Sequence, residues 1–145
     1  MNVIIRELKE SDIEALTAIE RDSFSMPWTA KDFQNLITRD YCLYVVAEVD
    51  GQTIGSAGLT DSFHEGNIDN VVVAEPFRGQ GVAQKLLQEL IARGEARGIE
   101  AFTLEVRVSN HTAIHVYEKL GFVSEGIRPH FYAQPDEDAV IMWRR

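Results

Sequence analysis

Cysteine, long apolar runs and metal-ligand spacings are scarce or absent in this sequence, which excludes several classes of protein. Cys42 is the only cysteine, so an intramolecular disulfide, a redox pair and a cysteine-rich zinc site are excluded. We expect Cys42 to be a small hydrophobic residue of a strand, with a catalytic thiol as the less favoured alternative. The four histidines are not spaced with carboxylates as metal ligands are, so no metal site is predicted.

Targeting and membrane signals are also lacking. No apolar run approaches the roughly 18 residues of a membrane-spanning helix. The start of the chain does not have the charged and then apolar build of a signal peptide. We therefore expect a cytoplasmic protein with no membrane partner.

Basic residues are few in comparison with acidic ones. The chain has 14 Lys and Arg against 23 Asp and Glu, a formal net charge of −9. Such a charge argues against binding nucleic acid or anionic membranes and favours a basic partner, although it can also serve solubility alone. The 145 residues fit one domain, 1–145, without repeats or linkers, and we expect a monomer or weak dimer.

Hydrophobic periodicity predicts the element order β-α-α-β-β-β-α-β-α-β-β. One helix is expected to begin near Gln80, and the other three are expected to be capped by Ser11 or Asp12, by Thr29, and by Ser109 or Asn110. The order predicts a mixed α/β fold with a single, mostly antiparallel sheet flanked by helices. The expected strands cover residues 2–8, 41–49, 52–62, 67–73, 101–108, 123–128 and 138–144.

A glycine-rich turn connects the predicted strand 67–73 to the helix that follows. Gly79 and Gly81 permit backbone angles closed to other residues, and the free N–H groups at a helix start favour an anion. No lysine ends the turn, so a nucleotide-hydrolysing P-loop is not expected, and the spacing is not G-x-G-x-x-G. The turn is therefore a candidate anion site, although such turns also occur without a ligand.

A second informative stretch runs from Leu104 to Asn110. In a strand, Glu105 and Arg107 share one face, and Tyr117 lies about two turns along the next helix. Aminolysis of a thioester needs an acceptor for the proton of the amine and a donor to the departing sulfur, and Glu105 and Tyr117 suit these roles. The alternatives are that Glu105 is paired with Arg107 and that Tyr117 is a core residue.

The ordinary pKa values of amines favour an α-amino group as the acceptor. An α-amine has a pKa near 8, whereas a lysine side chain has a pKa near 10.4. A single carboxylate base therefore has fewer protons to remove from a population of α-amines than from a population of lysine amines.

Five stretches together resemble a known family. The run Arg78-x-x-Gly81-x-Ala83 is similar to the coenzyme A pyrophosphate loop of the GCN5-related N-acetyltransferase (GNAT) superfamily, whose fold has the predicted element order. All five resemble the RimI-type ribosomal-protein-alanine N-acetyltransferases. The other four are Ser23-Phe24-x-x-Pro27-Trp28, Leu104-Glu105-Val106-Arg107-x-Ser109-Asn110, Ala113-x-x-x-Tyr117-x-x-x-Gly121-Phe122 and Glu137-Asp138-Ala139-x-x-Met142.

This resemblance implies an acetyl-CoA-dependent enzyme in which Glu105 is the general base and Tyr117 the general acid. The implied substrate is the N-terminal alanine of the eighteenth small-subunit ribosomal protein, whose basic chain end suits an acidic enzyme. We expect the peptide to lie between the 24–28 loop and the 128–138 segment, held by Phe24, Trp28, Tyr132 and Asp138. The residues expected to bind the coenzyme are Val71, Val72, Val73, Arg78, Gly79, Gln80, Gly81, Val82, Ala83, Gln84 and Asn110.

Two departures from the family pattern affect the substrate more than the reaction. Phe131 precedes Tyr132 where relatives often have paired tyrosines, and Ala83 stands where glycine is common. The alternative functions are a GNAT enzyme acting on a lysine side chain or a small amine, and a noncatalytic acyl-CoA-binding sensor.

Overall fold

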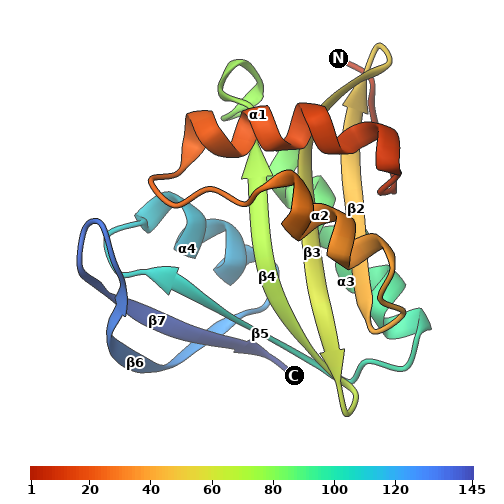
Figure 1. The fold of residues 1–145 in the computed structure, drawn as a ribbon. Coiled ribbons are helices and arrows are strands. Elements are labelled where there is room, and N and C mark those ends of the chain that lie inside the picture. The colour runs from red at the N-terminus through yellow and green to blue at the C-terminus, as the bar shows by residue number, and fades with distance from the viewer.

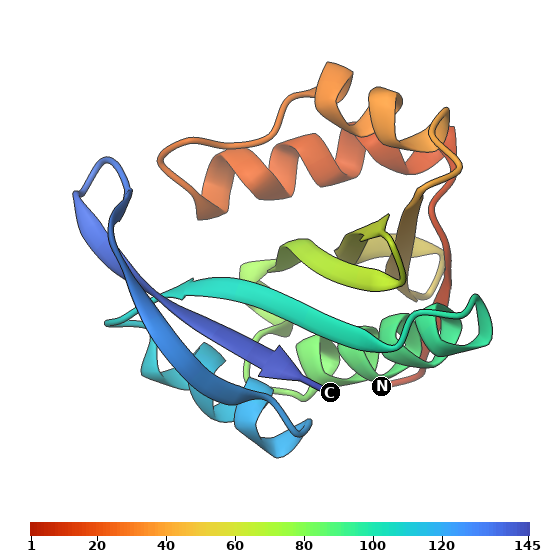
Figure 2. The same ribbon diagram turned by 90° about the horizontal axis from the view of Figure 1, so that it is seen from below.

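The computed structural model describes residues 1–145 and shows one seven-stranded sheet between two pairs of helices. Helices α1 (Ile13–Ser23) and α2 (Ala30–Ile37) cover one face, and α3 (Val82–Ala96) and α4 (His111–Lys119) lie on the other (Figures 1 and 2). The strand order is β1-β2-β3-β4-β5-β7-β6, and only the β4–β5 pair is parallel. This confirms the predicted mixed α/β fold with a mostly antiparallel sheet. The strands are β1 (Val3–Glu7), β2 (Cys42–Val49), β3 (Gln52–Ser62), β4 (Glu65–Val73), β5 (Ala101–Arg107), β6 (Val123–Tyr132) and β7 (Glu137–Arg144).

The core has one part on each face of the sheet. A cluster of 19 buried residues packs α3 against the sheet, and a cluster of 7 lies under α1 and α2. Val45, Val46 and Ala47 of β2 are 0 % exposed, so the middle of the sheet is covered on both faces. The sheet is therefore a rigid base for the loops at its edges. None of the helices is long and apolar enough to cross a membrane.

Strands β4 and β5 diverge in the middle of the sheet. They pair only where residues 65–67 face residues 101–103, and no ladder joins them beyond that point. A bulge accompanies the divergence, because Gly58 pairs with Asn70 and Leu59 with Ile68, which leaves Asp69 as the extra residue. The sheet is thus open at its centre, next to the turn that leads into α3.

Local sequence signals located most of the helix starts. The Thr29 hydroxyl accepts a hydrogen bond from the Asp32 N–H, which confirms the predicted cap of α2. The Asn110 side chain accepts one from the Ala113 N–H, so Asn110 and not Ser109 caps α4. Gly98 follows α3 with φ of +98°, as expected of a helix stop.

Helix α1 begins where predicted, with Asp12 at its N-cap position, but the Asp12 side chain makes no capping hydrogen bond to the helix. Asp12 lies at the helix start, but its carboxylate closes the preceding 3₁₀ turn (Glu10–Asp12) by accepting from the Lys9 N–H, and it also accepts bonds from Arg6 and Thr53, each at 2.7 Å. Burial opposes ionisation of this carboxyl, yet the hydrogen bonds from Arg6 and Thr53 lower its pKa to about 2. Asp12 therefore ties α1 to the first strand instead of capping the helix.

Two strands are longer than predicted. Phe63 and His64 both have positive φ, so they form the whole turn and β4 begins at Glu65 instead of residue 67. β6 runs to Tyr132 instead of residue 128, because it pairs again with β7 through Tyr132 and Glu137 after an irregular stretch. Both differences depend on cross-strand pairing, which local propensity does not report.

Candidate active site

A cavity of about 920 Å³ occupies the opening between β4 and β5. We call it the central cavity. Its walls come from β4, β5, α4, the end of α1, the α1–α2 loop, the turn before α3, the start of α3, the end of β6 and the β6–β7 loop. It therefore brings together segments that are more than 100 residues apart in the chain.

The glycine-rich turn forms one end of the central cavity. Gly79 and Gly81 have φ of +74° and +79°, and no atom lies within 4 Å of where their β-carbons would be. Gly81 takes the N-cap position of α3 without a side-chain cap, and the first helical bond is donated by Lys85. The N–H groups of residues 82–84 thus remain free for a ligand.

Arg78 supports this end of the cavity with a cation. Its Nε donates to the Val73 carbonyl at 2.8 Å and its Nη2 to the Ser23 hydroxyl at 2.8 Å, while no carboxylate pairs with it. Gln80 is turned away, because its amide donates to the Pro76 carbonyl, and it does not line the cavity. The other ten residues expected to bind the coenzyme all line it: Val71, Val72, Val73, Arg78, Gly79, Gly81, Val82, Ala83, Gln84 and Asn110.

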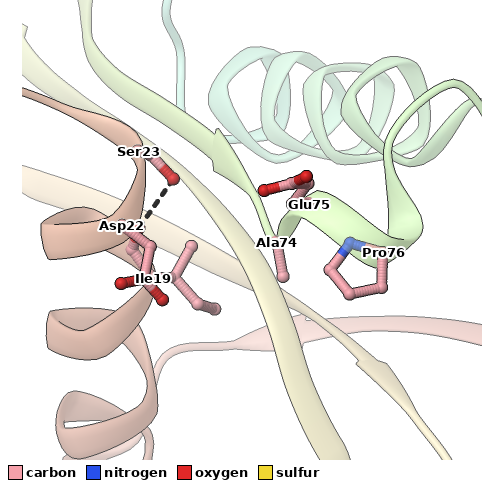
Figure 3. Close-up of a pocket in the computed structure, with 6 residues that line it drawn as sticks. All are labelled: Ile19, Asp22, Ser23, Ala74, Glu75 and Pro76. Carbon is pink, nitrogen blue, oxygen red and sulfur yellow. Dashed lines mark hydrogen bonds between the residues drawn. The ribbon is translucent and has the colours of Figure 1, made fainter.

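A second hollow of about 590 Å³ lies beside this end, between α1 and the start of the turn. Figure 3 shows Asp22 on α1 and Glu75 across the hollow, and the Ser23 hydroxyl donates to the Ile19 carbonyl at 2.6 Å. Two carboxylates and no cation line this hollow. It is therefore unsuited to an anion such as a diphosphate.

Glu105 projects from β5 toward the side of the sheet covered by α1. Its neighbours Leu104 and Val106 are 1 % and 5 % exposed and belong to the core cluster on the α3 side, whereas the Glu105 side chain is 19 % exposed. All three residues line the cavity. The nearest cation is Arg128 of β6, whose Nη1 lies 4.0 Å from Oε1. Glu105 is thus held on a rigid strand and only loosely paired.

The alternative pairing of Glu105 with Arg107 does not form. Arg107 Nη1 instead contacts Glu137 Oε1 at 3.2 Å and the Pro135 carbonyl at 3.0 Å, and its Nη2 donates to the Ala133 carbonyl. Its guanidinium also lies 4.4 Å from the centroid of the Tyr132 ring. Arg107 therefore fixes the β6–β7 loop.

Tyr117 of α4 lines the central cavity from the α3 side. Its ring packs against the 19-residue core cluster and meets Phe122 edge-on at 5.8 Å, while its hydroxyl makes no hydrogen bond within the chain. Burial, with a smaller effect of Tyr132, raises the pKa of Tyr117 to about 12. Tyr117 is thus both a packing residue and a neutral phenol at the cavity wall.

The other end of the cavity lies under two loops. Ser25 in the α1–α2 loop donates to the Gln134 carbonyl in the β6–β7 loop at 2.7 Å, and Figure 2 shows these loops approaching one another over the sheet. Phe24, Trp28 and Tyr132, all expected to bind the peptide, line the cavity here.

Asp138, also expected to bind the peptide, does not line the cavity. Its Oδ1 accepts a hydrogen bond from the His130 N–H at 2.9 Å. Asp136 pairs with the His130 ring, and Glu137 pairs with Arg107. The acidic residues at the start of β7 therefore hold the hairpin together.

Three polar residues at this end were missed by sequence reasoning. Glu20 of α1 is 0 % exposed, and its Oε1 accepts from Asn70 Nδ2 at 2.6 Å while its Oε2 has no hydrogen-bond partner. Asp69 accepts from the Thr60 hydroxyl at 2.6 Å. The signal available was the polar pair Asp69-Asn70 within an otherwise apolar strand.

Other candidate groups carry no site. Cys42 begins β2 and is half-buried, as expected, and burial raises the pKa of its thiol, which disfavours a thiolate nucleophile. No group of three or more His, Cys, Asp or Glu side chains is arranged to hold a metal ion.

Comparisons with known proteins agree with this geometry. Residues 13–122 match the model of the acetyltransferase (GNAT) family. The chain is 34% identical to the putative [ribosomal protein bS18]-alanine N-acetyltransferase of Bacillus subtilis (strain 168), with 96% of this chain and 93% of the relative covered. It is also 34% identical to the [ribosomal protein bS18]-alanine N-acetyltransferase of Escherichia coli (strain K12), with 95% and 94% covered. The crystal structure of the ribosomal-protein-S18-alanine N-acetyltransferase from Escherichia coli superposes with a TM-score of 0.90 at 32% identity, covering 99% of this chain and 93% of that one.

Proposed function

The chain belongs to the acetyltransferase (GNAT) family, whose members use acetyl-CoA, and on this premise we propose that it acetylates the N-terminal alanine of ribosomal protein bS18. The observation that carries the proposal is the central cavity, which joins a glycine turn with free amides to a carboxylate and a neutral phenol. Relatives of nearly the same length that carry this activity in their names support the choice of substrate.

The glycine turn is proposed to hold the coenzyme by its diphosphate. The free amides at the start of α3 and the unpaired guanidinium of Arg78 supply hydrogen bonds and positive charge. The main chain of residues 71–73 borders the opening between β4 and β5, where it is accessible to the pantetheine arm. These contacts fix the position of the reacting acyl group relative to Glu105 and Tyr117.

Glu105 is proposed to act as the general base. It accepts a proton from the acceptor amine, directly or through water, so that the nitrogen lone pair is free to form the new C–N bond. An α-amine with a pKa near 8 is neutral in about a tenth of molecules at pH 7, and a lysine amine in far fewer. The single loosely paired carboxylate on β5 therefore suits an N-terminal acceptor.

Tyr117 is proposed to donate to the departing sulfur as the C–S bond breaks. Its pKa of about 12 keeps the phenol protonated at every pH at which the reaction runs. Its hydroxyl makes no hydrogen bond within the chain and is available to a ligand. The amine proton and the phenol proton then balance the reaction, since one leaves the nitrogen and one reaches the thiol.

Acetyl transfer to a designed pair of peptides tests this function. One peptide begins Ala-Arg with a free α-amine, and the other has a blocked α-amine and one internal lysine. We expect transfer from acetyl-CoA to the first peptide alone. Equal modification of both would overturn the Nα assignment, and an absence of turnover despite coenzyme binding would support an acyl-CoA sensor instead.

A further inference from the structure

The charges of the central cavity are divided between its two ends. Arg78 stands without a carboxylate partner at the glycine turn. The opposite end carries the carboxylates of Glu20, Asp69 and Glu105, from α1, β4 and β5, and the only cation among its lining residues, Arg107, is paired with Glu137. We call this opposite end the acceptor end. It carries more carboxylates than the single general base that the reaction requires.

Asp69 is the accessible carboxylate without a cationic partner. No salt bridge includes it, whereas Arg128 lies 4.0 Å from Glu105. The Thr60 hydroxyl fixes Oδ2 at 2.6 Å, and Oδ1 has no hydrogen-bond partner in the chain. Partial removal from water, with a further effect of Glu105, raises the pKa of Asp69, and a bound cation would relieve both effects.

The bulge in β4 brings Asp69 and Asn70 to the same side of the sheet. Two successive residues face the α1 side of the sheet, since Asp69 contacts Thr60 and Asn70 contacts Glu20. In a regular strand one of the two would point to the α3 side. The bulge therefore puts the Asn70 amide on the same side as the Asp69 carboxylate, where it holds Glu20 behind Asp69.

Glu20 lies behind Asp69, and burial raises the pKa of its carboxyl. It is 0 % exposed and its Oε2 has no partner, so its carboxyl is incompletely satisfied at the wall of the same cavity. Asn70 lies next to Asp69 in the chain and holds the other oxygen of Glu20 at 2.6 Å. Solvent does not reach Glu20, so Asp69 is the group that contacts a ligand.

We propose that Asp69 is a specificity-determining residue that binds the basic side chain of the acceptor's second residue. This rests on the proposed function and names a feature of its substrate. A carboxylate that held the α-ammonium would oppose loss of the amine proton. A carboxylate that holds a guanidinium stabilises the bound substrate and the transition state equally. Asp69 and Glu105 line the same cavity, and the negative charge of Glu105 affects the pKa of Asp69, so one peptide end can meet both carboxylates.

The test compares two peptides that differ only at the second position, Ala-Arg and Ala-Gln. Asp69→Asn keeps the size of the side chain and an oxygen for the Thr60 hydroxyl. Asp61→Asn is the matched control, because it removes the same charge from β3 outside the cavity. We expect Asp69→Asn to raise KM for Ala-Arg about fivefold, as for a modest ion pair, with kcat unchanged and Ala-Gln affected less than twofold.

The pH dependence separates the two possible cations. The guanidinium stays charged at pH 9, whereas an α-ammonium with a pKa near 8 does not. The effect of Asp69→Asn on Ala-Arg is therefore expected at both pH 7 and pH 9. An effect that vanishes at pH 9, or that is equal for the two peptides, overturns the proposal.

Calorimetry in the presence of coenzyme A, which has no acyl group to transfer, keeps this test independent of turnover. Wild type should bind Ala-Arg about fivefold more tightly than Ala-Gln, and Asp69→Asn should lose the difference. Selective binding without acetylation would leave the Asp69 inference standing and defeat the proposed function. Acetylation without selective binding would leave the proposed function standing and defeat the Asp69 inference.

Discussion

The two ends of the central cavity are built from different parts of the chain. The glycine-turn end consists mainly of backbone amides that Gly79 and Gly81 leave uncovered. The acceptor end consists of side chains from five elements and two loops, with carboxylates, aromatic rings and hydroxyls. A backbone site tolerates most substitutions around it, whereas a side-chain site changes with each one. One end is thus suited to a constant ligand, and the other to a selected one.

Replacing Glu105, at the acceptor end, should have the largest effect on turnover. Glu105→Gln removes the proton acceptor and is expected to lower kcat by roughly 10³-fold, while the Kd for acetyl-CoA changes less than twofold. Steady-state kinetics and calorimetry measure the two quantities. A variant that retains turnover within a factor of ten would refute the assignment of Glu105 as the base.

Tyr117→Phe should have the next largest effect. We expect a loss of roughly 10²-fold in kcat, smaller than for Glu105, because a thiolate with a conjugate-acid pKa near 8.5 can leave without full proton transfer. Since burial raises the pKa of Tyr117 to about 12, ionisation of this phenol should not reduce wild-type turnover below about pH 11. A fall in activity near pH 10 that is missing in Tyr117→Phe would contradict this.

A glycine substitution tests whether the coenzyme end is a backbone site. Gly81→Ala and the control Gly51→Ala both place a β-carbon at a positive φ, +79° and +78°, with open space around it. Each is expected to lower the free energy of unfolding by about 1 kcal/mol. Only Gly81→Ala should also raise KM for acetyl-CoA, by roughly tenfold, because the shifted turn misaligns the free amides. Equal KM values for the two variants would count against the glycine turn as the coenzyme site.

The smallest effect is expected where the two loops meet over the acceptor end. Ser25→Ala removes the hydrogen bond to the Gln134 carbonyl, worth about 1 kcal/mol at most in an exposed place. KM for the peptide should rise about threefold and KM for acetyl-CoA should stay constant, with Ser124→Ala on exposed β6 as the control. A change in the coenzyme KM would show that the two ends are not separate.

Local patterns in the sequence were sufficient for most of the framework. Side-chain alternation placed Glu105 opposite Leu104 and Val106, and polar residues before apolar runs located the starts of α2 and α4. The glycine turn was found because positive φ at a helix start strongly selects glycine. These features depend on residues within a few positions of each other.

The acceptor end could not be worked out in the same way. The ion pair of Glu105 with Arg128 and that of Arg107 with Glu137 join different strands, and sequence neighbours suggested the wrong partner. Glu20 reads as part of the polar face of an amphipathic helix, and its burial depends on how α1 lies on the sheet. That Asp69 and Asn70 face the same side of the sheet depends on a bulge, which is a property of two paired strands.

The brief contact between β4 and β5 leaves an opening in the sheet that the arm of the coenzyme would fill under the proposed function. Beyond residue 67, the edge of β4 that faces β5 carries peptide groups with no strand opposite them. Binding along this edge should slow hydrogen exchange of those amides and couple the motions of the β5–β7 part to those of the β1–β4 part. The bound coenzyme would then contribute to the rigidity of the protein.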